Sequence, residues 1–386
     1  MPDRVRTPWW RNVQVLRWLA QLVAMAVVGV ALWLLWFNVT NNLASRGIRT
    51  DFGFLDQPFG VRIAGSDLSP GSAVRLALLN GIRNTFALAI VGLPLLTLLG
   101  VAVGVGRLSG NWLLSKICTA YVELLRNLPP LLLVIFAFQA VILRLPPARS
   151  PATPFGWFVI SNLELHVPSL RAGENYRAFS ISLLGAVVLA FALWWWRTRA
   201  QQSTGRPHHR WLWSIGIFLT AGAAAYLALG RPITISRPVL VGRVVEGGYR
   251  GLGSYFAVMG ALVLYTASHV AEIVRGSILA VPKGQSEAAT ALALSAFQRF
   301  SFVVLPQAMR IALPPIINQY LNYVKNTSLA IAIGFAEVTL IAFQAIGNGQ
   351  PAPQVILILM GCYLIFSLAI SLAVNLYSRR MRLAVQ

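Results

Sequence analysis

The sequence predicts an all-α, polytopic membrane protein, and three observations lead to this fold class. The chain is 57% hydrophobic and only 11% charged, with a mean hydropathy of +0.67, whereas soluble domains carry about 25% charged residues. The apolar residues gather in runs of about 20, the length that crosses a bilayer as a helix. The net charge of +21 does not indicate a nucleic-acid-binding domain, because the basic residues lie between these apolar runs.

Eight apolar runs are long enough to be transmembrane helices. The first follows a basic N-terminal stretch, as in a signal peptide, but no Ala-x-Ala exit follows it, so we expect a retained anchor. The third is interrupted at its start by Arg126, Asn127 and the pair Pro129-Pro130. The eight runs are 18–37, 85–106, 125–143, 179–196, 211–229, 255–275, 328–348 and 355–376.

The basic residues predict the orientation of the chain, because short cytoplasmic loops are enriched in Lys and Arg. With the N-terminus in the cytoplasm, the basic loops 107–116 and 197–210 lie inside, as do all three lysines. The outside segments also carry arginines, but they hold six acidic residues as well. Eight spans then place both termini on the cytoplasmic side, together with the polar segment between the sixth and seventh spans.

That polar segment is predicted to contain a helix at 286–304. The cluster 282–284, Pro-Lys-Gly, breaks the preceding span. Ser286 can cap the new helix, and Glu287 then lies in its first turn, where the helix dipole favours a carboxylate. Pro306 is expected to end the helix, because proline lacks an N–H and restricts the residue before it.

Small residues mark one face of this predicted helix. Ala289 and Ala293 are four residues apart, so they share a nearly flat face that the backbone of another protein can approach closely. These residues alone leave a second interpretation open, in which the helix is a connector that packs on its own protein.

The pattern within the segment resembles a known motif. A Glu-Ala-Ala triplet, a small residue and a Leu-Pro pair at these spacings resemble the EAA loop of ABC importer permeases, although the family pattern has Gly where this chain has Ala293. The resemblance implies that the 286–304 helix is a cytoplasmic coupling helix that contacts an ATPase. The coupling residues that it implies are Glu287, Ala288, Ala289, Ala293, Leu305 and Pro306.

Motifs outside this segment extend the resemblance. Together they are similar to the polar amino acid, or general L-amino acid, subfamily of ABC importer permeases, and they cover about 75–144 and 255–380. The matching motifs are LNGIRNT at 79–85, ELLRNLP at 123–129, AEIVRG at 271–276, VPKGQ at 281–285 and NYVKNTSLA at 322–330.

The resemblance implies a domain organisation. A five-helix permease core is split into two parts, 85–144 and 255–386, and the second part contains the EAA-type cytoplasmic loop 276–327. An N-terminal anchor helix and a periplasmic segment precede the core at 1–84. An insertion with two extra transmembrane helices separates the two parts at 145–254.

The resemblance also implies a function and partners. The function is ATP-driven import of L-amino acids from periplasm to cytoplasm across the bacterial inner membrane, where membrane lipid surrounds the spans. An ATP-binding cassette ATPase dimer would hydrolyse the ATP. A second permease subunit would complete the pore as a heterodimer, and a periplasmic amino-acid-binding protein would deliver the substrate.

Ionisable residues in the predicted spans are candidates for the translocation path, because charges at membrane depth are costly and usually face a cavity or a partner. Glu337 lies nearly mid-span without a local basic partner. Two Glu/Arg pairs at a spacing of three residues can form ion pairs on one helical face, and a purely structural role for these pairs is the open alternative. The candidates are Glu337, Glu272, Arg275, Glu123, Arg126 and His269.

The sequence argues against several chemistries. It contains no Gly-x-x-x-x-Gly-Lys-Ser/Thr loop for ATP and no metal-ligand or catalytic constellation, and its two cysteines give no disulfide framework. We therefore expect a transport subunit that is not an enzyme and needs no cofactor. Two alternatives stay open, an ion-driven secondary transporter and a non-transporting membrane scaffold. The matching halves typical of secondary transporters are not seen.

Overall fold

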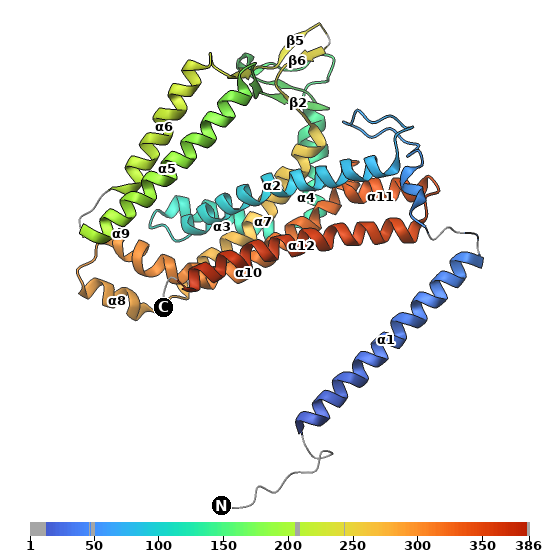
Figure 1. The fold of residues 1–386 in the computed structure, drawn as a ribbon, viewed down its shortest axis with the longest axis horizontal. Coiled ribbons are helices and arrows are strands. Elements are labelled where there is room, and N and C mark those ends of the chain that lie inside the picture. The colour runs from blue at the N-terminus through green and yellow to red at the C-terminus, as the bar shows by residue number, and fades with distance from the viewer. Residues whose placement is uncertain (1–12, 46, 48–50, 205–208, 243, 384–386) are drawn as a thin grey trace, which may run out of the picture. The chain divides into compact units, whose positions relative to one another are not determined.

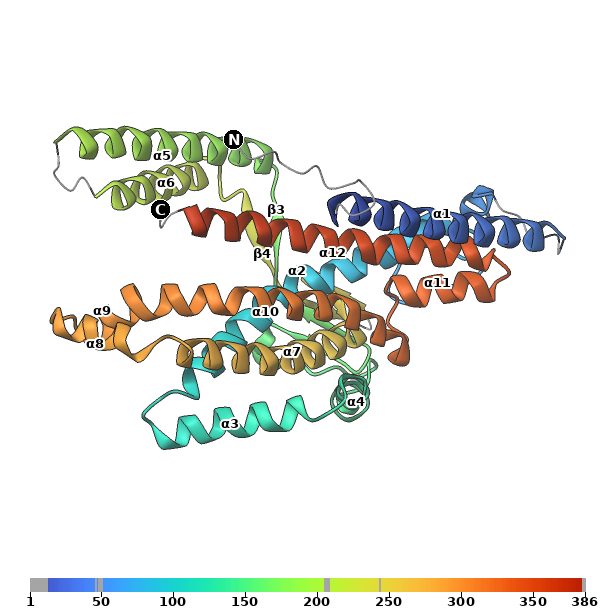
Figure 2. The same ribbon diagram turned by 90° about the horizontal axis from the view of Figure 1, so that it is seen from below.

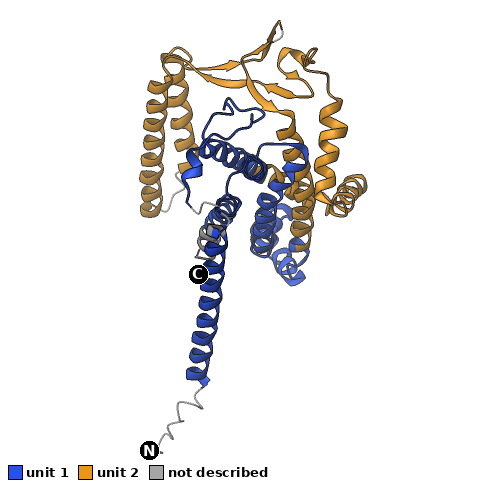
Figure 3. Cartoon of the chain, turned by 90° about the vertical axis from the view of Figure 1, so that its right-hand side faces the viewer, with its two compact units in different colours: residues 1–93, 277–386 blue, residues 94–276 orange. Residues whose placement is uncertain are grey.

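The computed structural model describes residues 13–45, 47, 51–204, 209–242 and 244–383. It is mainly helical, and its elements are labelled in chain order in Figure 1. The chain divides into two compact units (Figure 3). The first unit combines 1–93 with 277–386, and the second consists of 94–276.

Seven described helical segments are long and apolar enough to cross a membrane, which confirms the predicted polytopic all-α class. An eighth crossing is formed if Trp112–Arg126 (α3) and the helix that begins at Pro130 (α4), which meet at 103°, count as one broken span. The seven segments are Val13–Asn42 in α1, Val74–Gly106 (α2), Tyr176–Thr204 (α5), Arg210–Ala228 (α6), Gly253–Leu279 (α7), Ala296–Ile333 and Ala352–Leu372 in α12.

The structure corrects the position of the seventh span. The expected loop 276–327 contains a long helix, α10 at Leu305–Asn326, which packs beside α12 of the same unit (Figure 2). The expected span 328–348 is instead a 3-10 turn, a bend at Gly334 with φ of 70°, and the short helix α11 at Val338–Gly347. A left-handed residue cannot continue an α-helix, so the helix ends at Gly334. The polar side chains of α10 are the reason why its sequence did not indicate a helix of membrane-spanning length.

The core of the first unit joins its two chain segments. Phe54 and Phe59, from the segment before α2, pack with Val74 of α2, Ile341 of α11 and Val355 of α12. All five side chains are almost completely buried. Asn348 donates a 3.1 Å hydrogen bond to the carbonyl of Phe59 and so fixes the end of α11 to this segment.

Two glycines of α2 permit close packing within the first unit. A Cβ on Gly81 would lie 2.9 Å from Cα of Val338, and a Cβ on Gly92 would overlap the phenol ring of Tyr323. Tyr323 is fully buried, and its hydroxyl donates a 3.0 Å hydrogen bond to the carbonyl of Leu88. The start of α2 is therefore held directly against 323–338.

The second unit uses the same device at the other end of α2. Gly100 and Gly104 form a Gly-x-x-x-Gly pair, and added Cβ atoms would lie within 3 Å of Val270, the carbonyl of Ala271 and Val274 of α7. Small residues at this spacing let two membrane helices approach closely and gain van der Waals contact.

The insertion contains antiparallel strands that the all-α prediction did not include. The strand order β1-β2-β7 forms one sheet, and the pairs β3-β4 and β5-β6 form two more. Their bounds are Val159–Ile160 (β1), Glu164–Val167 (β2), Ser169–Ala172 (β3), Ile233–Ser236 (β4), Val239–Val241 (β5), Val244–Glu246 (β6) and Tyr249–Leu252 (β7).

One polar cluster links β2 and β7. Glu164 forms ion pairs with Arg250 and with His166, the latter at 3.2 Å. Burial acts to raise the pKa of the Glu164 carboxyl, but the hydrogen bonds and charges of Arg250 and His166 outweigh it and hold that pKa below its usual value.

Replacing Gly92 with Ala should destabilise the protein by about 1–3 kcal/mol, because the added methyl group overlaps the buried ring of Tyr323. Thermal unfolding of the purified protein in detergent measures the effect. Gly361→Ala in α12 is the matched control, since a Cβ there meets no atom within 4 Å. Equal unfolding temperatures for the two variants would contradict the close contact between α2 and Tyr323.

Candidate functional site

The segment with the Glu-Ala-Ala triplet is not the single 286–304 helix that we predicted. The first helix, α8, spans Lys283–Ala291 with Pro282 at its N-cap, so Ser286 is not the cap. A second short helix, α9 at Ala296–Arg299, continues through a π-helical turn into α10. Pro306 lies in the first turn of α10 and does not end a helix, because a first-turn proline loses no hydrogen bond.

The break between α8 and α9 is a Schellman motif centred on Ala293. The N–H of Ala293 bonds to the carbonyl of Thr290 at 2.9 Å, and the N–H of Leu294 bonds to that of Ala289 at 3.2 Å. This pattern requires a left-handed residue after the helix, and Ala293 has φ of 56°. Glycine adopts this conformation without penalty, which gives a physical reason for the glycine of the EAA pattern at this position.

The predicted flat face made of Ala289 and Ala293 does not form. Ala289 is 2% exposed because it faces the rest of its own segment, and Ala293 lies in the turn. Glu287 and Ala288 are exposed, so they are accessible to another protein. The larger exposed surface consists of apolar side chains that we did not predict: Leu292, Phe297 and Phe302, at 76%, 77% and 68% exposure.

Side-chain hydrogen bonds give the segment a defined shape. Ser295 and Gln298 form a reciprocal capping box at the start of α9. Arg299 donates a 3.0 Å hydrogen bond to Thr290, and Gln307 donates one of 3.1 Å to Gln285. These contacts join α8 to α9 and α10, so the segment is a folded element with an apolar surface. We call residues 283–304 the EAA segment.

Glu337 does not lie in the middle of a span, because it is the N-cap of α11. Its carboxylate accepts hydrogen bonds from the backbone N–H of Leu340 at 3.0 Å and from the hydroxyl of Tyr363 at 3.1 Å. The hydroxyls of Thr339 and Tyr363 lie 2.9 Å apart. The side chain is completely buried in the first unit. Its hydrogen-bond partners are the N-terminus of α11 and Tyr363 of α12.

Polar residues of α2 hold the backbone that precedes this cap. Asn84 donates a 2.7 Å hydrogen bond to the carbonyl of Ala336, and Thr85 accepts one of 3.2 Å from the N–H of Val338. Both residues belong to the 79–85 motif, which we used for the resemblance without assigning it a site. Asn84, Thr85, Glu337 and Tyr363 form what we call the Glu337 node.

Glu272 lies among three arginines within the second unit. It forms ion pairs with Arg107 and Arg275, and Arg126 approaches it to 3.9 Å. The predicted spacing of Glu272 and Arg275 thus gives a contact. Arg107 lies 165 residues away in the sequence, and no local pattern could have indicated it.

The predicted pair of Glu123 and Arg126 is absent. Glu123 is exposed and has no ion pair within the described part of the chain, because Arg126 turns toward Glu272. His269 does not bond to Glu272 either: its Nδ1 lies 3.1 Å from the carbonyl of Tyr265. Of the six path candidates, Glu272, Arg275 and Arg126 form one cluster and Glu337 lies in the Glu337 node, whereas Glu123 and His269 belong to neither.

The described residues contain no group of three or more His, Cys, Asp or Glu side chains that could hold a metal ion.

Comparison with known proteins identifies the family. The family model described as "Binding-protein-dependent transport system inner membrane component" matches residues 96–383. The chain is 37% identical to the putative amino-acid ABC transporter permease protein YhdX of Escherichia coli, over 96% of this chain and 95% of that protein. The chain belongs to this family of ABC transporter permeases.

A further relative agrees with this assignment. The permease is 37% identical to the general L-amino acid transport system permease protein AapQ of Rhizobium johnstonii, over 94% of this chain and 91% of that protein. A solved structure, "Crystal structure of an amino acid ABC transporter with histidines", matches at 17% identity and a TM-score of 0.46, covering 79% of this chain and 94% of the other. The permease is a multi-pass inner-membrane transport subunit, as its family and its apolar helices show.

Replacing Ala293 with Gly should stabilise the EAA segment by about 1 kcal/mol, because the left-handed conformation costs an L-residue roughly that amount. Ala293→Val should have the opposite effect, since a β-branched side chain tolerates this conformation least. Limited proteolysis of the purified permease at the exposed bonds of 292–298 measures local opening. Faster cleavage of the glycine variant than of the native protein would contradict the Schellman geometry.

Proposed function

We propose that this permease subunit moves L-amino acids from periplasm to cytoplasm and that ATP hydrolysis in a separate ATPase dimer drives the movement through the EAA segment. The observation that carries the proposal is the exposed apolar surface of a folded, hydrogen-bonded element. Leu292, Phe297 and Phe302 are each largely exposed on that element, and apolar side chains that are exposed outside the membrane are typical of a protein-binding surface.

The sequence supports a cytoplasmic position for the EAA segment. Counting the broken pair α3 and α4 as one span gives eight crossings, which put both termini and the EAA segment on the same side. Basic residues in the short loops favour the cytoplasm for that side. The surface is then available to an ATPase, which the permease needs because its own sequence lacks a P-loop.

The other partners follow from the family. A periplasmic binding protein would deliver the amino acid, and a second permease subunit, in a heterodimer, would complete the path. The relative AapQ is described as part of a general L-amino acid transport system, which supports L-amino acids as the substrate class for this permease.

The Glu272 cluster is the better candidate for the translocation path. It combines one carboxylate with three guanidinium groups, and the side chain of Arg126 is 42% exposed. A partly exposed arginine beside a satisfied ion pair can bind the carboxylate of a passing amino acid. Glu337 has the partners of a structural residue, and we assign it to holding α11.

The coupling proposal is tested at Leu292. Leu292→Asp should reduce co-purification of the ATPase and ATP-dependent uptake by roughly tenfold or more, because an unpaired charge in a buried contact costs several kcal/mol. Leu292 is 76% exposed, so the permease itself should fold and insert normally. The buried Ala289 is a poor test position, since a charge there would unfold the segment directly.

The matched control is Gln202→Asp, which adds the same charge at an exposed residue of the basic α5–α6 loop region on the same predicted side. It should leave ATPase binding and uptake unchanged. Normal co-purification and normal uptake by Leu292→Asp would refute the assignment of the EAA segment as the coupling surface.

A further inference from the structure

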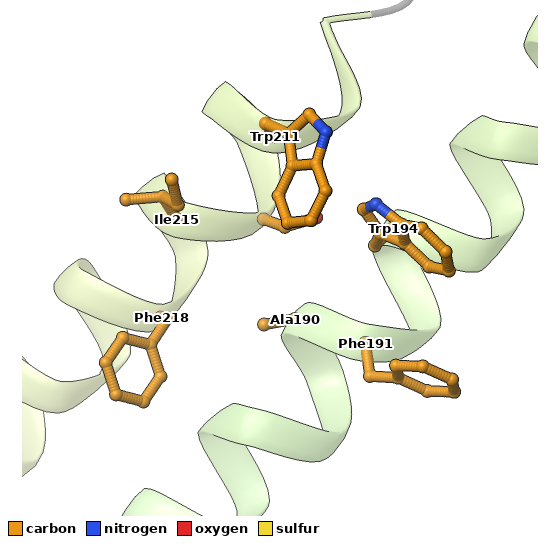
Figure 4. Close-up of a pocket in the computed structure, with 7 residues that line it drawn as sticks. Ala190, Phe191, Trp194, Trp211, Ile215 and Phe218 are labelled. Atoms are coloured by element: carbon orange, nitrogen blue, oxygen red, sulfur yellow. The ribbon is translucent and has the colours of Figure 1, made fainter. Parts of the chain in front are cut away.

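The inserted helical hairpin of α5 and α6 is closed at one end and open at the other. At the closed end, Asn175 donates a 3.1 Å hydrogen bond to the carbonyl of Leu229, and the rings of Phe179 and Tyr226 lie 6.0 Å apart. Toward the end where the two helices are joined, a groove of about 400 Å³ separates them (Figure 4).

The groove changes character along its length. Trp194 of α5 and Trp211 of α6 lie with their rings 5.9 Å apart at one end. Ala190 and Phe218 line the other end, and Phe218 is about 10 Å further along α6 than Trp211 at 1.5 Å per residue. Tryptophans prefer the membrane–water interface, so the groove runs from interface depth into the hydrocarbon layer.

Two polar groups in the groove have no partner. Ser214 is 7% exposed, and its Oγ makes no hydrogen bond; the Nε1–H of Trp194 is also buried and makes none. Buried polar groups are nearly always hydrogen-bonded. The indole N–H can only donate, so the missing partner carries an acceptor oxygen.

Arginines surround the aromatic end of the groove. The guanidinium of Arg210 lies 5.8 Å from the ring of Trp194, that of Arg197 lies 4.5 Å from Trp213, and Arg199 stacks on Trp195 at 3.8 Å. Stacking uses the face of a guanidinium, whereas its N–H donors lie in its plane.

The surrounding sequence adds to this positive charge. Residues 197–210 contain four arginines and neither Asp nor Glu. Helix α6 begins at Arg210 without a side-chain cap, and the free N–H groups at a helix start attract anions. The aromatic end of the groove therefore favours a negatively charged group.

We infer that the α5–α6 groove is a binding site for one anionic phospholipid of the inner membrane. Its phosphate contacts Arg210 and the start of α6, its ester and glycerol oxygens accept from Trp194 and Ser214, and one acyl chain lies between Ala190, Phe191 and Phe218. A phospholipid has this order of charge, ester oxygens and hydrocarbon, whereas a free phosphate has no hydrocarbon that could contact the apolar part of the groove. The inserted hairpin would then bind a lipid molecule between its two helices.

Native mass spectrometry of the purified transporter complex, delipidated in detergent and then titrated with phosphatidylglycerol or phosphatidylcholine, tests the site. The native complex should retain one phosphatidylglycerol and bind phosphatidylcholine roughly tenfold more weakly. Arg210→Gln should weaken phosphatidylglycerol binding by roughly fivefold, since each basic residue near an anionic lipid contributes about that factor. Ala190→Phe, which fills the groove, should abolish it.

Arg177→Gln is the control, because it removes the same charge at an exposed position near the opposite end of α5, and it should bind lipid normally. Glycerol 3-phosphate, which has the charge without the acyl chains, should not displace the lipid. Equal retention of the two lipids, displacement by glycerol 3-phosphate, or normal binding by Arg210→Gln would overturn the proposal. Arg210 lies at the start of α6, where a substitution is not expected to prevent folding. Its variant therefore tests the site even if Ala190→Phe fails to fold.

Discussion

The hydrogen bonds of the buried Glu337 carboxylate are the constraint on which the first unit depends. A carboxylate removed from water is costly unless donors satisfy it. Here the N–H of Leu340 and the hydroxyl of Tyr363 do so, which ties the start of α11 to α12. Asn84 and Thr85 of α2 bind the backbone on either side of Glu337. Helix α2 thus meets the neighbouring helices α11 and α12 at one node, although Asn84 lies 252 residues before Ala336.

Close contacts of α2 also hold other helices within each unit. The Gly-x-x-x-Gly pair of α2 packs against α7, the helix that carries Glu272 and Arg275. In the first unit, α10 runs from the EAA segment to Tyr323, which lies against Gly92 and Leu88 of α2.

Composition and apolar runs were sufficient to predict the fold class, and the spaced motifs were sufficient to predict the family. The predicted helix boundaries were wrong where the conformation of a single residue determined them. The methyl group of Ala293 gave no sign of a left-handed turn, and Gly334 divided a run that is mainly apolar. Partners distant in the sequence, such as Arg107 with Glu272, were also beyond local patterns. Glu337 was predicted as a candidate for the translocation path, whereas its capping role in the structure depends on the bend before it, which the sequence pattern did not indicate.

The most direct test compares Glu337→Ala with Glu337→Gln in the assembled transporter, by thermal unfolding and by ATP-dependent uptake per folded complex. Glutamine keeps an acceptor for Leu340, so it should retain most of the stability. Alanine should lose about 1–2 kcal/mol, as for a lost helix cap, and lower the yield of folded complex, while each folded complex still transports. An alanine variant with native stability and abolished uptake would contradict the structural role of Glu337 and place its carboxylate in the translocation path.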